Sequence, residues 1–162
     1  MSPIEGRPWA TPEAFFADEA EQFRPFEAIL DLDAAALDDG PRAHGWSARD
    51  VLSHLVGWHY VATEVAGELR TSPVSQRKAA ADAEWDARGD EINEEIRVAW
   101  AALPLDEFRS HARAARQGLL DALHAAPLAH WWDSDEYLAY FVSELQGHYA
   151  DHRAALDVVL GR

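Results

Sequence analysis

Three histidines of the chain, His54, His148 and His152, stand at positions where a helical pattern calls for Leu or Val. His148 and His152 are four residues apart, so both rings project from the same face of a helix, one turn apart. They lie within an apolar stripe of that helix, which consists of Tyr137, Phe141, Leu145, Leu156 and Val159. Imidazole nitrogens ligate transition metals, and this spacing lets one helix present two of them.

The third imidazole comes from an earlier helix. At roughly 100° of rotation per residue, His54 lies at the edge of an apolar face. That face comprises Val51, Leu55, Trp58, Ala62, Val65 and Leu69. A lone histidine in such a place is explained by a bond to a backbone carbonyl, and an HxxxH pair also occurs without a metal. Three inward rings need partners for two nitrogens each, and a shared cation would satisfy all three.

These residues predict a divalent metal site made of His54, His148 and His152. Three protein nitrogens leave one or more coordination positions to water, which is typical of a reactive rather than a purely structural metal. Neutral imidazoles suit zinc, nickel or ferrous iron, and the sequence does not choose among these ions. The chain has no cysteine, so disulfides, thiolate ligands and a cysteine nucleophile are excluded.

Two carboxylates lie near the predicted site. Glu144 is one turn before His148 and is predicted to orient a ring N–H, to ligate the metal or to act as a base. Asp151 lies about 60° around the helix from His148. The alternative for both is an exposed carboxylate that pairs with Arg153 or water.

Pocket residues are predicted on neighbouring helices. Trp58, Asn93 and Glu94 are expected to line a substrate pocket, although a plain surface face also explains the last two. His59 lies about 140° around the helix from His54, so it should face another helix or solvent and is not predicted as a ligand. Several of the seven tryptophans could form an aromatic pocket or core anchors, among them Trp58, Trp85, Trp131 and Trp132.

Helices must position these side chains, because no alternating strand pattern of useful length occurs. Thr11 and Pro12 begin a first helix that is expected to reach about Leu37, where residues 38–41 end it. Ser47 caps a second helix, with Asp50 close to a capping box, and this helix should continue to Leu69 or Arg70.

A polar connection that is expected to contain some helix follows over residues 71–83. A third helix is predicted from about Trp85, broken near Leu103 and Pro104, and resuming from Leu105 to about His124. Residues 133–136 cap a last helix that reaches Leu160. The prediction is an all-α, up-and-down four-helix bundle with a long connection between helices 2 and 3, an architecture that builds metal sites in its core.

Composition limits the partners. The 162 residues, of which 48% are hydrophobic, fit one domain over residues 1–162. The sequence has no apolar run of about 18 residues, so no membrane partner is expected. It shows no signal peptide at the N-terminus, and a cytoplasmic location is expected. The net charge of −15 argues against nucleic acid. A small-molecule substrate and a homodimer are expected.

The sequence also resembles a known superfamily. The segment Gly45–Leu55 (GWSARDVLSHL) and the later His148–His152 (HYADH) look like the DinB/YfiT-type four-helix bundles. The resemblance implies a three-histidine metal site made of one histidine on the second helix and an HxxxH pair on the last. Here these would be His54, His148 and His152, the residues that the stripe geometry also selects.

Within the superfamily, Leu55–His59, the stretch from Trp85 to Ile96 and the His148-Tyr149 step are similar to the ClbS/DfsB branch. That branch implies self-protection by hydrolysis of a reactive cyclopropane in a genotoxin. Asp151-His152-Arg153 departs from that branch, which usually has an aromatic and then basic residues there, and this departure weakens the transfer of cyclopropane hydrolysis. The mycothiol- and bacillithiol-dependent transferases and isomerases are another relative, and they would supply a low-molecular-weight thiol.

The hypothesis from the sequence is a metal-dependent enzyme. A divalent ion on the three histidines would activate water or a small thiol toward an electrophilic small molecule, as a hydrolase or a thiol transferase in detoxification. The first alternative is a bundle that binds a small molecule or toxin without metal and without turnover. The second is a dimeric scaffold whose histidines satisfy each other.

Overall fold

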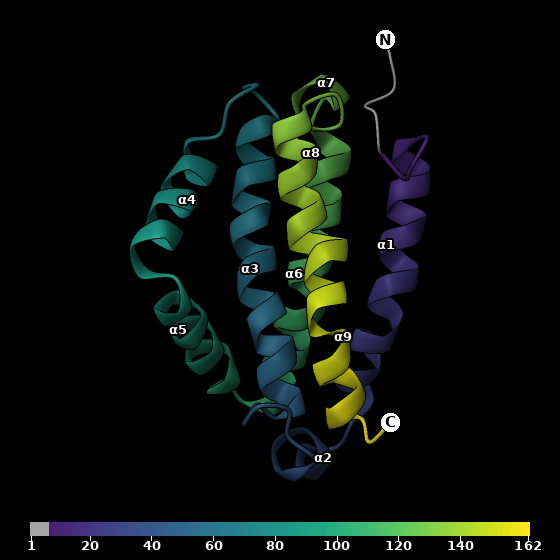
Figure 1. Cartoon of the computed structure of the whole chain (residues 1–162), viewed down its shortest axis with the longest axis vertical. Coiled ribbons are helices and arrows are strands. Elements are labelled where there is room, and N and C mark those ends of the chain that lie inside the picture. Colours follow the sequence, from purple (N-terminus) through teal and green to yellow (C-terminus); the bar gives the residue numbers. More distant parts are fainter. Residues whose placement is uncertain (1–6) are drawn as a thin grey trace.

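The structure is a computed structural model that describes residues 7–162, and in this part the regular elements are all helices. Residues 1–6 lie outside the described residues. They are part of the N-terminal segment in which the sequence predicts no signal peptide. Four long members form a bundle (Figure 1), as predicted. They are α1 (Pro12–Glu27), α3 (Ala48–Leu69), α6 (Leu105–Ala125) and a last member made of α8 (Asp135–Val142), η2 (Ser143–Gly147) and α9 (His148–Val159).

The helix starts follow from capping side chains. Thr11 accepts a hydrogen bond from the backbone N–H of Ala14, and Pro12 opens α1. Ser47 and Asp50 form a complete capping box at the start of α3, because each side chain accepts from the backbone N–H of the other residue. The capping box fixes where α3 begins and therefore the rotation at which its later residues face the bundle.

The predicted first helix is wrong in its second half. Instead of reaching Leu37, α1 ends at Glu27 and passes into the 3₁₀ turn η1 (Ala28–Asp31). A separate short helix, α2 (Ala34–Asp39), follows. The side chain of Asp33 accepts from the N–H of Ala36 at 2.8 Å, so this residue caps a new helix rather than continuing the old one.

The connection between the second and third members contains two helices, α4 (Gln76–Arg88) and α5 (Asp90–Ala101). The predicted helix start at Trp85 is wrong, because Trp85 lies in α4 and Gly89, with φ of +46°, separates α4 from α5. The predicted break near Pro104 is present. Both helices flank α3 outside the bundle and return the chain to the end where α3 began (Figure 1). As a result, α3 and α6 run in the same direction, so the second and third members of the bundle are parallel and do not alternate as the up-and-down prediction implies.

The sequence predicted one regular α-helix for the last member, but the structure contains an irregular turn within it. The turn over η2 is a π-helix, which accommodates an extra residue per turn. At Gly147 a Cβ atom would lie 3.1 Å from the carbonyl oxygen of Val142, so the absence of a side chain relieves a close approach in this turn. Glu144 lies in the π turn and His148 follows it directly, so the turn sets their relative orientation.

The core centres on α3, which packs against α4, α5, α6 and α9. Because it is covered on several sides, nearly all of its first three turns are buried. The largest fully buried side chains include Trp131, Tyr149, Phe15, Phe26, Phe108 and Phe141. Among the described residues, no helix combines the length and the apolar composition that a membrane crossing requires.

Candidate metal site

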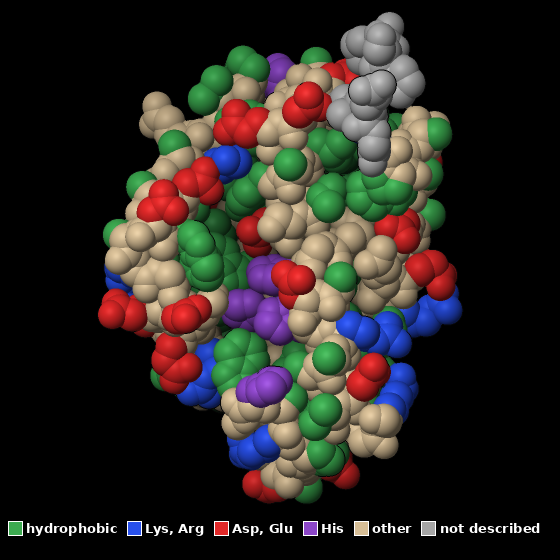
Figure 2. Space-filling model, in the orientation of Figure 1, with side chains coloured by type: hydrophobic (Ala, Val, Ile, Leu, Met, Phe, Trp, Pro, Cys, Tyr) green, Lys and Arg blue, Asp and Glu red, His purple; other side chains and the backbone are tan. Residues whose placement is uncertain are grey.

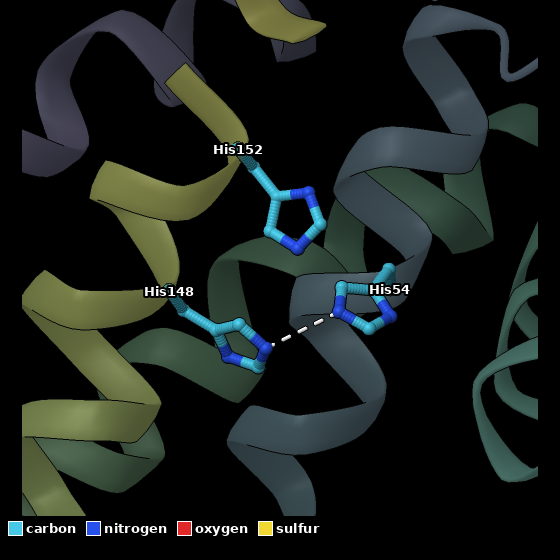
Figure 3. Close-up of side chains that lie close together, drawn as sticks. All are labelled: His54, His148 and His152. Atoms are coloured by element: carbon cyan, nitrogen blue, oxygen red, sulfur yellow. Dashed lines mark hydrogen bonds between the residues drawn. The ribbon is translucent and has the colours of Figure 1, made fainter. Parts of the chain in front are cut away.

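The structure brings the three predicted histidines together (Figure 3). His54 projects from α3, and His148 and His152 project from α9 toward it. Each ring offers one nitrogen, and these nitrogens all lie within 4.8 Å of one another. The Nε2 atoms of His54 and His148 are 3.2 Å apart. A single ion could therefore contact all three rings.

All three rings are neutral at physiological pH. Burial, together with the smaller effect of the neighbouring His148 and His152, lowers the pKa of His54 to about 3. Burial likewise lowers the pKa of His148 to about 4 and lowers that of His152. A neutral imidazole keeps the lone pair that binds a metal, so the protonation state suits ligation.

The donor set fits a transition metal. Two nitrogens that bind one zinc ion at about 2.0–2.1 Å with tetrahedral angles are about 3.3 Å apart, close to the 3.2 Å between His54 and His148. The alternative is a hydrogen bond between these two rings, which engages only one nitrogen of each. Within the described part of the chain, the buried Nδ1 atoms of both rings have no hydrogen-bond partner.

Glu144 lies behind His148. Its Oε2 atom is 3.7 Å from Nδ1 of His148 and is buried, with no hydrogen-bond partner among residues 7–162. Burial raises the pKa of Glu144 to about 8, with a smaller contribution from Asp82. The alternative of an exposed carboxylate is therefore wrong for Glu144. Asp151 is exposed, as that alternative predicted. Its predicted partner Arg153, however, pairs with Asp157.

A cavity of about 780 Å³ opens beside the histidines, within the size range of small-molecule sites. Figure 2 shows the histidine side chains in a hollow between the α4–α5 arm and the last member of the bundle. Its aromatic lining consists of Trp46, Trp58, Trp85 and Tyr140. The site therefore combines possible ligands with room for a substrate.

The predicted pocket residues divide into two groups. Trp58 and Asn93 line the cavity, and the Trp58 Nε1–H donates to Asn93 Oδ1 at 2.9 Å. Glu94 does not line the cavity: it is exposed and binds Arg97 one turn away. One step along a helix turns a side chain by about 100°, enough to leave the cavity.

The tryptophans divide in the same way. Trp85 lines the cavity and packs edge-on against Trp58, with ring centroids 5.8 Å apart. Trp131 and Trp132 pack around Phe15 in the core and do not line the cavity. The tryptophans of α3 and α4 thus belong to the aromatic lining of the cavity, whereas the other pair anchors α7 (Leu128–Trp131).

Sequence reasoning missed several lining residues, namely Trp46, Lys78, Ala81, Asp82, Glu136, Ala139, Tyr140 and Ser143. Tyr140 was within reach of the same counting, since it lies one turn before Glu144. Lys78 and Asp82 were not, because their segment reads as a polar connection. Nothing in the sequence shows that α4 folds back against the histidines.

His59 lies outside the cluster, in a second buried network. Its Nε2 atom is 3.3 Å from the hydroxyl of Tyr149, which donates to Glu19 at 2.8 Å. Arg116 also donates to Glu19, whose side chain is fully buried. Burial lowers the pKa of His59 to about 3. The residue faces neighbouring helices rather than the three-histidine cluster.

The family model for the mycothiol maleylpyruvate isomerase N-terminal domain matches residues 16–154. The match covers more than half of the chain, so the protein belongs to this family, a DinB-like four-helix domain. No curated protein and no solved structure matches the chain. The family and the helical bundle agree on the superfamily that the sequence resembles.

Proposed function

We propose that this protein is a metal-dependent enzyme that acts on an electrophilic small molecule. The observation that carries the proposal is the three-histidine cluster, whose neutral rings offer nitrogens within 4.8 Å of one another beside the cavity. His54, His148 and His152 would hold a divalent zinc, nickel or iron ion. When bound, such an ion supplies Lewis-acid activation of water or of a small thiol.

The chain's own residues position the reaction. Glu144 would accept a hydrogen bond from Nδ1–H of His148 and so direct the opposite nitrogen, Nε2, toward His54. The aromatic walls of Trp58 and Trp85 would exclude water and hold the substrate's apolar part. The substrate enters beside the histidines, because the cavity reaches all three rings.

Two reaction classes are compatible with this site. The family name refers to mycothiol and to an isomerase, which supports thiol chemistry. The chain has no cysteine, so the thiol would be a separate small molecule. Hydrolysis is the other class, and it follows from the likeness to the ClbS/DfsB branch. We propose thiol chemistry first, because the family match supports it.

Elemental analysis tests the metal. The protein is purified without a histidine tag or chelating column, beside His148→Ala and the exposed control His124→Ala. We expect about one equivalent of a transition metal in the wild type and in the control, and none in His148→Ala. Absence of metal from the wild type, even after zinc, nickel and ferrous iron are added, overturns the proposal.

The second candidate is a bundle that binds a small molecule without turnover. The cavity and its aromatic lining favour it, because both would serve binding without a metal. Chelation separates the two functions. A binding protein keeps its ligand after chelator treatment and in His148→Ala, whereas the enzyme loses turnover in both.

A further inference from the structure

The cavity beside the histidines carries an excess of carboxyl groups. Of the described residues that line it, one is cationic, Lys78, and four are acidic: Asp82, Glu136, Glu144 and Asp151. Three of these acids, Asp82, Glu136 and Asp151, are exposed at the entrance and are named the acidic rim here. Figure 2 shows carboxylates around the hollow. A ligand that enters the cavity therefore passes a negative potential.

Lys78 does not offset this potential for a ligand. Its ammonium is held by Asp82 at 2.7 Å and by Glu136 at 3.3 Å, and its side chain is 13% exposed. The same ammonium lies 5.6 Å from the ring centroid of Tyr140. The cavity wall thus already binds one ammonium group by two carboxylates and an aromatic face. An anionic ligand would have to displace both carboxylates to reach Lys78.

The rest of the cavity offers the same chemistry, with no second Lys or Arg among the described residues that line it. Trp85 is 43% exposed and stands edge-on to Trp58, so indole surface faces the hollow. Glu144 lies deeper, and its buried Oε2 atom has no hydrogen-bond partner in the described part of the chain. Indole faces attract cations more strongly than the other aromatic rings do. Aromatic surface, a buried acceptor and exposed carboxylates are complementary to a cationic nitrogen.

We propose that the substrate of this cavity carries a cationic nitrogen, an amine or a quaternary ammonium, held against Trp58 and Trp85 and facing the acidic rim. This inference rests on the proposed function, because it takes the cavity to be the substrate pocket of that enzyme. The electrophilic part of the substrate then lies toward the histidines. Anionic groups are disfavoured at the acidic rim, because Lys78 is already held by two of its carboxylates.

Three probes that share a phenylethyl body test the charge preference: 2-phenylethylammonium, 2-phenylethanol and 3-phenylpropanoate. Binding is measured by calorimetry and tryptophan fluorescence on metal-free and zinc-loaded protein. In the metal-free protein, where the carboxylate has no zinc to bind, we expect the ammonium to bind at least about tenfold more tightly than the carboxylate, with the alcohol between them. Added salt should reduce the preference, because the rim is exposed to solvent.

Variants locate the preference in the cavity. Asp82→Asn should reduce the preference for the ammonium by about threefold or more. Asp86→Asn is the control and should keep the preference, because it changes the net charge equally from a position on the same helix that does not line the cavity. Trp85→Leu should weaken ammonium binding about fivefold. Lys78→Met should strengthen it, because a competing cation is removed.

The outcomes separate this inference from the proposed function. An ammonium preference in a protein that binds no metal supports the charge inference and overturns the metalloenzyme. Tighter binding of the carboxylate, abolished by Lys78→Met, overturns the inference and identifies Lys78 as an anion receptor. Equal binding of the three probes, or no binding up to their solubility, overturns it as well, whatever the metal content.

Discussion

Oε2 of Glu144, which lies in the π turn η2, is 3.7 Å from Nδ1 of His148, the first residue of α9. In a regular α-helix these residues, four apart, would stand on nearly the same face. The wider π turn changes the angle between them and also sets the rotation of α9, which carries His152. The geometry of the candidate metal site therefore depends on this one irregular turn.

Gly147→Ala tests that dependence. The new Cβ atom would lie 3.1 Å from the carbonyl oxygen of Val142, so the π turn has to shift. We expect a loss of about 1 kcal/mol in the free energy of unfolding and weaker zinc binding in a competition assay. Gly118→Ala in α6 is the control, since its Cβ meets open space, and it should raise stability by about 0.5–1 kcal/mol. Equal stabilisation by both changes would contradict the prediction.

Glu144 should make the metal-free protein less stable at alkaline pH. Burial raises its pKa to about 8 in the folded state, against a usual 4.5. Between these values the folded state keeps a proton that the unfolded chain releases, so stability is full below pH 4.5 and falls as pH rises toward 8. The loss is on the order of a few kcal/mol.

Glu144→Gln removes the titrating group at nearly the same size. Urea unfolding in the presence of a chelator, between pH 5 and pH 8, should therefore show a flatter pH dependence for the variant. Glu136→Gln, exposed at the start of α8, serves as the control and should keep the wild-type slope. If the wild type and Glu144→Gln have the same slope, the carboxyl is not held protonated.

Glu19 and Arg116 form the buried ion pair of the second network. Glu19→Gln should cost about 3–5 kcal/mol, because it leaves the guanidinium without its counter-charge inside the bundle. Glu21→Gln removes an exposed partner of Arg24 on the same helix and should cost less than about 0.5 kcal/mol. Chemical denaturation measures both. Similar small losses would show that the pair adds little to stability.

Much of the site could be predicted from the sequence because its ligands lie on regular helices. The capping box at Ser47 fixes the start of α3, and counting rotation from it places His54 inward. The apolar stripe on the last helix survives the π turn, so His148 and His152 were still assigned to the inner face. The four-helix bundle followed from the same periodicity and from proline and capping positions.

The rest depends on contacts between distant segments. Ser75 caps α4 within a stretch whose composition is typical of a loop, and Tyr137, from α8, accepts a hydrogen bond from the backbone N–H of Ser75 at 2.6 Å. Such tertiary contacts have no local signal in a single sequence. The polar residues of α4 therefore read as solvent-exposed, although Lys78 and Asp82 line the cavity. Glu94 was misplaced for the opposite reason, since a one-residue step decides which side of α5 it occupies.

His148→Leu separates the metal site from a scaffold whose histidines only satisfy each other. Without metal, the change removes the unsatisfied Nδ1 atom of His148 and also its contact with Nε2 of His54, so both interpretations predict a similarly small change in stability. With zinc they differ. A metal at one hundred times its dissociation constant stabilises the wild type by about 2.7 kcal/mol and raises its melting temperature, and the variant should not respond. His124→Ala should respond like the wild type. If zinc stabilises neither the wild type nor the control, the scaffold interpretation is the better one.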